Sequence, residues 1–183
     1  RAWVISTFLL TCVLLAMTVP GLGRYPPVSG DDSWVMSASY KLATTGVFGS
    51  DLYTGFHDAE RHYFIALPVY HLLQATSFVV FGTSVAAARA VTVASAIVVL
   101  WAVTWLALRW YGTATAIASG LLLILLRVNL VGLWSGLPLI AAGRTGRYDM
   151  TGVAFFWLTI VLLDRVVEQP GRRTIAALGC GML

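Results

Sequence analysis

The side chains able to do acid–base chemistry are concentrated in one part of the sequence. Five of the eight acidic residues and all three histidines lie between residues 31 and 71. A further acid, Asp149, stands just before an apolar run and close to Arg144 and Arg147. A carboxylate can take the proton from an attacking hydroxyl, and arginine suits paired hydrogen bonds to a phosphate. These residues are therefore candidates for catalysis and for anion binding.

The acidic residues beside predicted helices also have a structural explanation. Asp31 and Asp32 follow Ser29 and precede a stretch compatible with a helix, so that one of them is equally well explained as an N-cap. Asp149 stands at another predicted helix start, where the positive end of the helix dipole favours a carboxylate. Capping and catalysis stay open for all three.

A second polar group follows within the segment 57–62, namely His57, Asp58, Glu60, Arg61 and His62. Its spacing matches a solvated loop better than a compact metal motif on one helix face. Arg89 and Arg127 are expected near helix ends, with side chains that reach toward the membrane surface rather than toward a ligand.

The composition indicates an integral membrane protein. The 183 residues are 58% apolar and 11% charged, against about 45–50% and about 25% in soluble domains. Intrinsic disorder requires the opposite balance. The arginines are spread along the chain rather than clustered, which argues against a nucleic-acid partner.

Apolar runs that approach the ~20 residues of a membrane span predict an all-α, polytopic membrane protein with four or five transmembrane helices. The runs cover about 3–19, 85–108, 113–134 and 151–167, and another begins at 174. Residues 22–84 are expected to form an outer loop with interfacial helices. Because the sequence begins with Arg1 and stops inside an apolar run, we expect residues 1–183 to be a piece of a longer chain.

The segment 64–81 allows two interpretations. His71, Gln74 and Ser77 recur every three residues, which predicts a helix with a polar stripe, and Pro68 suits its first turn. We favour a helix lying in the interface, with its polar side toward water or a site. Both acidic groups then share the outer surface, and the arginines of the short turns lie inside. In the alternative, this segment spans the membrane.

Several motifs recur in an order that resembles a known family. They are Asp31-Asp32 after the first apolar run, Thr45-Gly46 closing a helical stretch, Pro68, Ala87-Ala88-Arg89, and the segment 143–149 before a later run. The set is similar to the N-terminal part of GT-C glycosyltransferases of the family 39 type, relatives of protein O-mannosyltransferases and lipid A aminoarabinose transferases.

The resemblance implies an enzyme that transfers a sugar from a polyprenyl-phosphate donor to a lipid, glycan or protein acceptor. It implies an active site on the extracytoplasmic side and a single displacement that inverts the anomeric carbon. Asp31 would be the catalytic carboxylate, with Asp32 at the second acidic position and Asp149 assisting. The positive charge that the departing phosphate needs is expected from Arg144 and Arg147.

A divalent metal ion is an alternative source of that positive charge. The residues considered for metal or phosphate contacts are His57, Glu60, Arg61 and His62, although their distance from Pro68 departs from the family pattern. The competing hypothesis is a non-catalytic membrane protein, either a transporter segment or a scaffold that binds a lipid carrier. A transporter is expected to hold ionisable groups near the bilayer midplane, whereas here the acids gather at a surface.

Overall fold

The computed structural model describes residues 2–63, 68–127 and 137–168, and these residues form helices joined by loops without any strand. The α-helices are α1 (Ala2–Thr18), α2 (Gly30–Thr45), α3 (Pro68–Phe81), α4 (Val85–Tyr111), α5 (Thr113–Leu125), α6 (Pro138–Gly143) and α7 (Asp149–Glu168), and η1 (Asp51–Tyr53) is a short 3-10 turn. The expected runs at 3–19, 85–108 and 151–167 thus lie within or largely within α1, α4 and α7. The expected run at 113–134 begins as α5, but 128–136 and the run from 174 lie outside the described residues.

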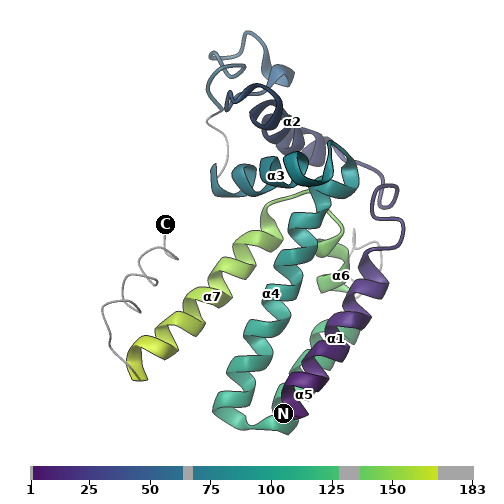
Figure 1. Ribbon diagram of the computed structural model, residues 1–183, viewed down its shortest axis with the longest axis vertical. Helices are drawn as coiled ribbons and strands as arrows, with labels where there is room; N and C mark the ends of the chain where they lie inside the picture. Colours follow the sequence, from purple (N-terminus) through teal and green to yellow (C-terminus); the bar gives the residue numbers. More distant parts are fainter. Residues whose placement is uncertain (1, 64–67, 128–136, 169–183) are drawn as a thin grey trace.

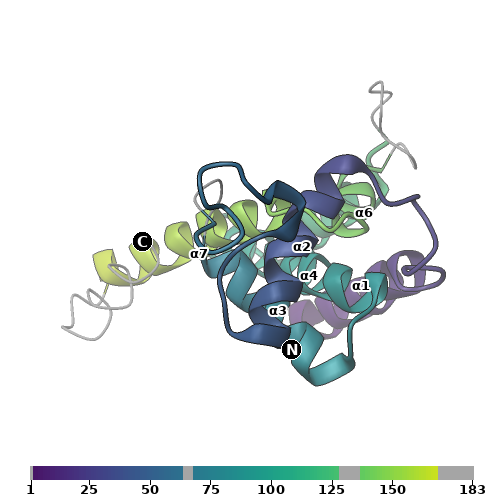
Figure 2. The same ribbon diagram turned by 90° about the horizontal axis from the view of Figure 1, so that it is seen from above.

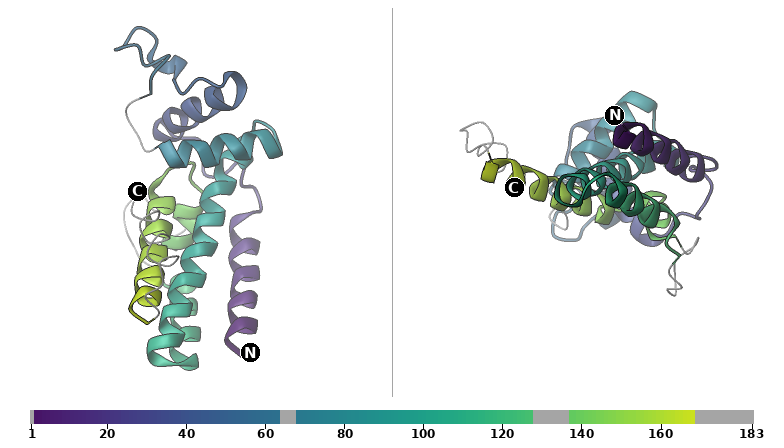
Figure 3. Two further views of the ribbon diagram at one scale, coloured as in Figure 1. Left: turned by 60° about the vertical axis from the view of Figure 1, so that its left-hand side comes forward. Right: turned by 90° about the horizontal axis from the view of Figure 1, so that it is seen from below.

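The helices form two layers (Figure 1). Helices α1, α4, α5 and α7 run roughly side by side, and α2 and α3 lie across one end of α4, as the side and top views also show (Figures 2 and 3). Helix α4 is the centre of the bundle because it contacts α1, α3, α5, α6 and α7. Ser84 caps its first turn by accepting a hydrogen bond from the Ala87 N–H at 3.1 Å.

The main apolar core lies where α1, α4 and α5 meet. Leu14, Leu100 and Ile124 are completely buried there, and Val99 is nearly so. Burying a side chain of this size stabilises the fold by about 1.5–3 kcal/mol.

Two of the described helices are long and apolar enough to cross a membrane, namely α4 and α7. They differ in packing. In the apolar stretch of α4, 56% of the residues are buried in the bundle, whereas in the apolar stretch of α7 only 17% are buried. Helix α7 therefore leaves large apolar side chains such as Phe156 and Leu163 uncovered. An apolar surface of this kind marks contact with lipid or with another protein segment.

Helix α3 lies with its polar stripe against the protein, so of the two expected directions, toward water or toward a site, the first is wrong. His71 and Gln74 are fully buried, and Ser77 is nearly so. The Ser77 hydroxyl donates to the Ala87 carbonyl at 2.6 Å, and the Gln74 amide donates to the Ala88 carbonyl at 3.2 Å. Gln74 and Ser77 face inward because α4 supplies acceptors, and His71 faces the Ser39 hydroxyl of α2.

The outer face of α3 is apolar, with Val79, Val80 and Phe81 each more than 60% exposed. The helix has 14 residues and is therefore about 21 Å long, shorter than the ~30 Å hydrocarbon core of a bilayer.

The buried imidazole of His71 makes the packing of α2 on α3 sensitive to pH. Its Nδ1 lies 2.8 Å from the Ser39 hydroxyl, and burial lowers its pKa from 6.5 to about 4. Because the folded state holds the ring neutral, the contribution of His71 to the free energy of unfolding is fully present above about pH 6.5 and falls as the pH drops from there toward 4.

We expect the thermal unfolding midpoint of the detergent-solubilised chain to fall over this pH range, and we expect His71→Gln to reduce the fall. His62→Gln, at an exposed histidine, is the control, and an unaltered pH profile in His71→Gln would assign the loss to other groups.

Candidate functional site

The first turn of α2 distinguishes the roles of the two adjacent acids. The Ser29 hydroxyl accepts from the Asp32 N–H, and the Asp32 carboxylate accepts from the Ser29 N–H, each at 3.2 Å. This reciprocal pair is a capping box. The N-cap is therefore Ser29, so the expectation that Asp31 or Asp32 is itself the N-cap is wrong; Asp32 is the third-position partner of the capping box, and Asp31 takes no part in it.

Asp32 also joins the outer layer to the bundle. Its side chain is almost completely buried, accepts from the Gly146 N–H at 3.1 Å and lies 3.5 Å from a guanidinium nitrogen of Arg89. Arg89 in turn donates to the carbonyls of Leu22 and Pro26, both at 2.8 Å. The expectation that Arg89 reaches toward the membrane surface is wrong, because its side chain has no exposed area and is paired inside the protein. Arg127 precedes a segment outside the described residues.

Asp31, Arg147 and Asp149 meet at the same end of the bundle. The Arg147 Nη1 lies 3.4 Å from an Asp31 oxygen, and its Nε lies 3.0 Å from an Asp149 oxygen. One guanidinium thus holds two carboxylates that are far apart in the sequence. All three side chains stay accessible, with 58% of Asp31, 41% of Arg147 and 55% of Asp149 exposed. This group of three residues is called the acidic site below.

A cavity of about 320 Å³ adjoins the acidic site. Its wall includes Pro26 and Ser29 from the loop before α2, and Ala142 and Thr145 from the region of α6. The loop after α6 is anchored from below by the buried Thr92 hydroxyl, which lies 3.0 Å from the Gly143 carbonyl and 2.6 Å from the Thr145 carbonyl. The volume lies at the lower end of the range of small-molecule sites, about 300–1,000 Å³.

Arg144 has a structural role, which corrects its expected role as a phosphate ligand. Its guanidinium donates five hydrogen bonds to the backbone carbonyls of Met17, Thr18, Pro20 and Tyr25, at 2.9–3.2 Å. A guanidinium has five N–H groups in all, so none is left for a ligand. Arg144 instead fastens the end of α1 and the following loop to α6.

The segment 57–62 is a loop in which Asp58, Arg61 and His62 are exposed and Ala59 is buried. The Glu60 carboxylate accepts from the Gly55 N–H, and backbone hydrogen bonds at Glu60 and Gly55 lower the pKa of this carboxyl. Arg61 and His62 lie 3.9 and 4.0 Å from Asp58. These contacts stay within the loop, and none of its residues lines the cavity.

The described side chains do not form a metal centre. No group of three or more His, Cys, Asp or Glu residues is placed to hold a metal ion in the parts of the chain that the structure describes. At the acidic site the space between the two carboxylates is occupied by a cation of the protein itself, Arg147. The divalent ion considered as an alternative source of positive charge stays a prediction, and the described residues do not show a ligand set for it.

Tyr70 is a neighbour of the site that the sequence did not reveal. Its ring packs edge-on against Tyr148 with the centroids 6.4 Å apart, and its hydroxyl accepts from the Gln74 amide at 3.1 Å. Burial, followed by the negative charges of Asp32 and Asp149, raises the pKa of this phenol. The hydroxyl thus stays protonated. In an aromatic-rich sequence, the local pattern around a tyrosine does not distinguish a position beside the acidic site from ordinary packing.

The acidic site combines an accessible carboxylate, a cation that bridges it to a second carboxylate, and an adjoining cavity at one end of a helical bundle. This arrangement can accept a proton and can bind an anionic group beside it. Comparisons with known protein families, with curated proteins and with solved structures found no match to this chain. Its chemistry is accordingly inferred from these residues and their geometry.

Proposed function

We propose that this chain is the N-terminal part of a GT-C glycosyltransferase of the family 39 type, which transfers a sugar from a polyprenyl-phosphate donor to a lipid, glycan or protein acceptor. The observation that carries the proposal is the bridge from Asp31 through Arg147 to Asp149 beside a cavity. It joins the two carboxylates that the family resemblance assigns to the active site.

In the proposed reaction the acceptor hydroxyl attacks the anomeric carbon of the donor from the side opposite the phosphate. A bond forms between the acceptor oxygen and this carbon, while the bond from the carbon to the phosphate oxygen breaks. Asp31 takes the hydroxyl proton as general base, and the polyprenyl phosphate leaves with the bonding electron pair. One displacement of this kind inverts the anomeric configuration.

Arg147 is the proposed partner of the phosphate. It uses one nitrogen for Asp31 and another for Asp149, and a guanidinium has further N–H groups for a charge-assisted hydrogen bond. Its half-exposed position lets a donor phosphate reach it. Asp149 orients the guanidinium from the first turn of α7, where the helix dipole favours its charge.

The proposed membrane arrangement places four or five spans in this chain, with the acidic site on the extracytoplasmic side. Helices α1, α4, α5 and α7 would belong to these spans, and α2 and α3 would form the outer layer. The apolar outer face of α3 supports a position in the interface. Arg109 and Arg165 at the other ends of α4 and α7 would face inward, as the positive-inside tendency predicts.

The competing proposal is a non-catalytic scaffold that binds a lipid carrier at the same place. The experiment that separates the two uses the full-length protein with both Asp31→Asn and Asp149→Asn. An enzyme loses sugar transfer in this double variant, whereas a scaffold shows no transfer in the wild type and only altered carrier binding. Transfer measured from a radiolabelled polyprenyl-phosphate sugar in proteoliposomes decides between them.

Removing the bridging guanidinium should weaken donor binding more than it disturbs the fold. We expect Arg147→Gln to raise the KM for the donor about tenfold or more, since a hydrogen bond to a charged group contributes about 1.5–3 kcal/mol. Arg147→Lys should recover part of the loss because it restores the charge without the fork geometry. Arg24→Gln, at an exposed arginine of the first loop, is the matched control. A donor KM unchanged in Arg147→Gln would remove Arg147 from phosphate binding.

A further inference from the structure

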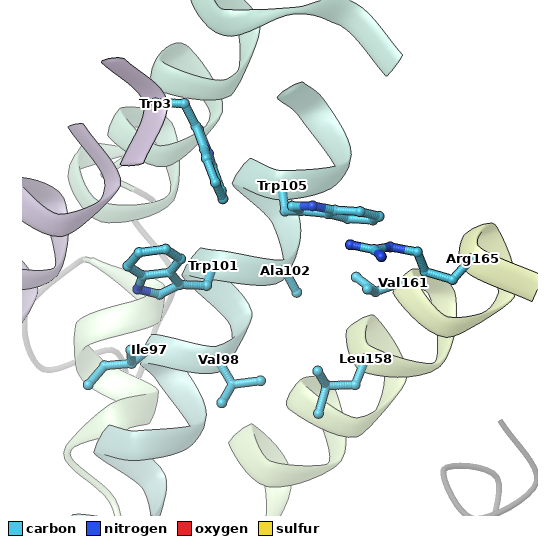
Figure 4. Close-up of a pocket in the computed structure, with 9 residues that line it drawn as sticks. All are labelled: Trp3, Ile97, Val98, Trp101, Ala102, Trp105, Leu158, Val161 and Arg165. Carbon is cyan, nitrogen blue, oxygen red and sulfur yellow. The ribbon is translucent and has the colours of Figure 1, made fainter. Parts of the chain in front are cut away.

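An apolar groove lies between the two candidate spans, toward the end of α4 that is distant from the acidic site (Figure 4). Its volume is about 460 Å³. Trp101 and Trp105 of α4 form one wall, and Leu158 and Val161 of α7 form the other. No residue that the structure describes lines both this groove and the cavity at the acidic site. The groove is therefore separate from the acidic site.

Two polar groups at the groove have unused binding capacity. The Arg165 guanidinium lies 4.8 Å from the centroid of the Trp105 ring, and it has no carboxylate partner among the described residues. Its neighbour Arg109, by contrast, is paired with Asp164 and Glu168. Trp3 also lines the groove, and its buried indole N–H has no acceptor in the described part of the chain.

We propose that this groove binds an acyl chain of an anionic phospholipid, with the lipid headgroup at Arg165. The aromatic and aliphatic walls fit a hydrocarbon chain, while the unpaired guanidinium fits a phosphate. The Trp3 N–H would donate to an ester oxygen of the same lipid, which would satisfy a donor that is otherwise costly to bury.

The surroundings favour a membrane lipid as the occupant. Helix α7 is the less covered of the two candidate spans, so that one wall of the groove belongs to a helix with an open apolar surface. Arg172 and Arg173 follow α7 in the sequence, and basic residues next to a span attract anionic lipids of the cytoplasmic leaflet. This inference depends on the proposed membrane placement of α4 and α7 but not on sugar transfer.

The test is lipid retention by the full chain, measured by native mass spectrometry after extraction into detergent with phosphatidylglycerol or phosphatidylcholine. We expect the wild type to retain phosphatidylglycerol preferentially. Arg165→Gln should lower its affinity about fivefold to tenfold and remove the preference. Val161→Trp should fill the groove and reduce the retention of both lipids.

Two matched controls keep the outcomes separate. Arg24→Gln removes an exposed arginine at the other end of the bundle, and Val167→Trp adds the same ring at a position that is 81% exposed and does not line the groove. Equal retention of both lipids by the wild type would overturn the proposal. An unchanged affinity of Arg165→Gln for phosphatidylglycerol would also overturn it. A wild type that forms a lipid-free dimer, which Val161→Trp dissociates, would show that a second copy of the chain occupies the groove instead. Asp31→Asn should retain the lipid whatever its effect on transfer, so the two proposals fail independently.

Discussion

If the proposed function holds, Asp31→Asn is expected to reduce sugar transfer by the full-length protein by a factor of about 10²–10⁴, the usual contribution of general acid–base catalysis. The amide keeps the shape of the side chain but cannot take the proton of the acceptor hydroxyl. The variant should fold normally, because the Asp31 side chain is 58% exposed and its ion pair with Arg147 is 3.4 Å long. Exposed pairs of this kind contribute about 0–1 kcal/mol.

The measurement is the initial rate of transfer from a polyprenyl-phosphate sugar in proteoliposomes, together with the thermal unfolding midpoint of the same preparation. Asp51→Asn is a matched control, since Asp51 is also an exposed aspartate paired with a cation, Lys41. Near-normal turnover in Asp31→Asn would exclude Asp31 as the base. Lost turnover with a lowered midpoint would instead show that Asp31 supports the fold, against the structure.

Asp32→Asn, in contrast to Asp31→Asn, should cause a large loss of stability. Its carboxylate is buried and serves the α2 cap, the Gly146 N–H and the Arg89 guanidinium together. Removing one partner of a buried ion pair leaves an uncompensated charge and costs about 3–5 kcal/mol. We therefore expect a clear fall in the free energy of unfolding, measured by denaturant titration in a mild detergent.

A double variant tests the reason for this loss. Arg89→Met removes the stranded charge, so that Asp32→Asn combined with Arg89→Met should lose less than the sum of the two single variants. The exposed pair of Lys41 and Asp51 supplies the comparison, because breaking it should cost about 0–1 kcal/mol. Additive losses in the double variant, or a loss in Asp32→Asn as small as in Asp51→Asn, would contradict the buried pairing.

The contrast between Asp31 and Asp32 shows how far the sequence alone could define the site. From the sequence either aspartate was expected to cap the helix, whereas the cap is Ser29 and its box partner is Asp32, which the Ser-x-x-acid spacing alone could have selected. The local spacing does not show that Asp32 is buried, because its burial depends on Gly146 and Arg89, which belong to distant parts of the chain and contact Asp32. Burial then makes Asp32 structural, and exposure leaves Asp31 available for chemistry.

The same limit applies to Arg144 and Arg147. Each follows a glycine in the same short segment, so local pattern assigns them the same role. In the fold Arg144 meets a set of backbone carbonyls and is saturated, whereas Arg147 meets two exposed carboxylates. Their partners at residues 17–31 lie more than one hundred positions earlier in the chain, and no local pattern encodes that distance.

Composition and periodicity were sufficient to predict the helical class and the apolar helices α4 and α7. The sequence also showed directly that most of the acidic residues lie between residues 31 and 71. These properties depend on side chains that are close in sequence, through apolar runs and helix repeats. The direction of the polar stripe of α3 was not predictable in this way. Its His71, Gln74 and Ser77 turn inward because Ser39 and the first turn of α4 offer hydrogen-bond partners, and such partners offset much of the cost of burying polar groups. Those partners are brought together by the packing of α2, α3 and α4, which only the folded chain contains.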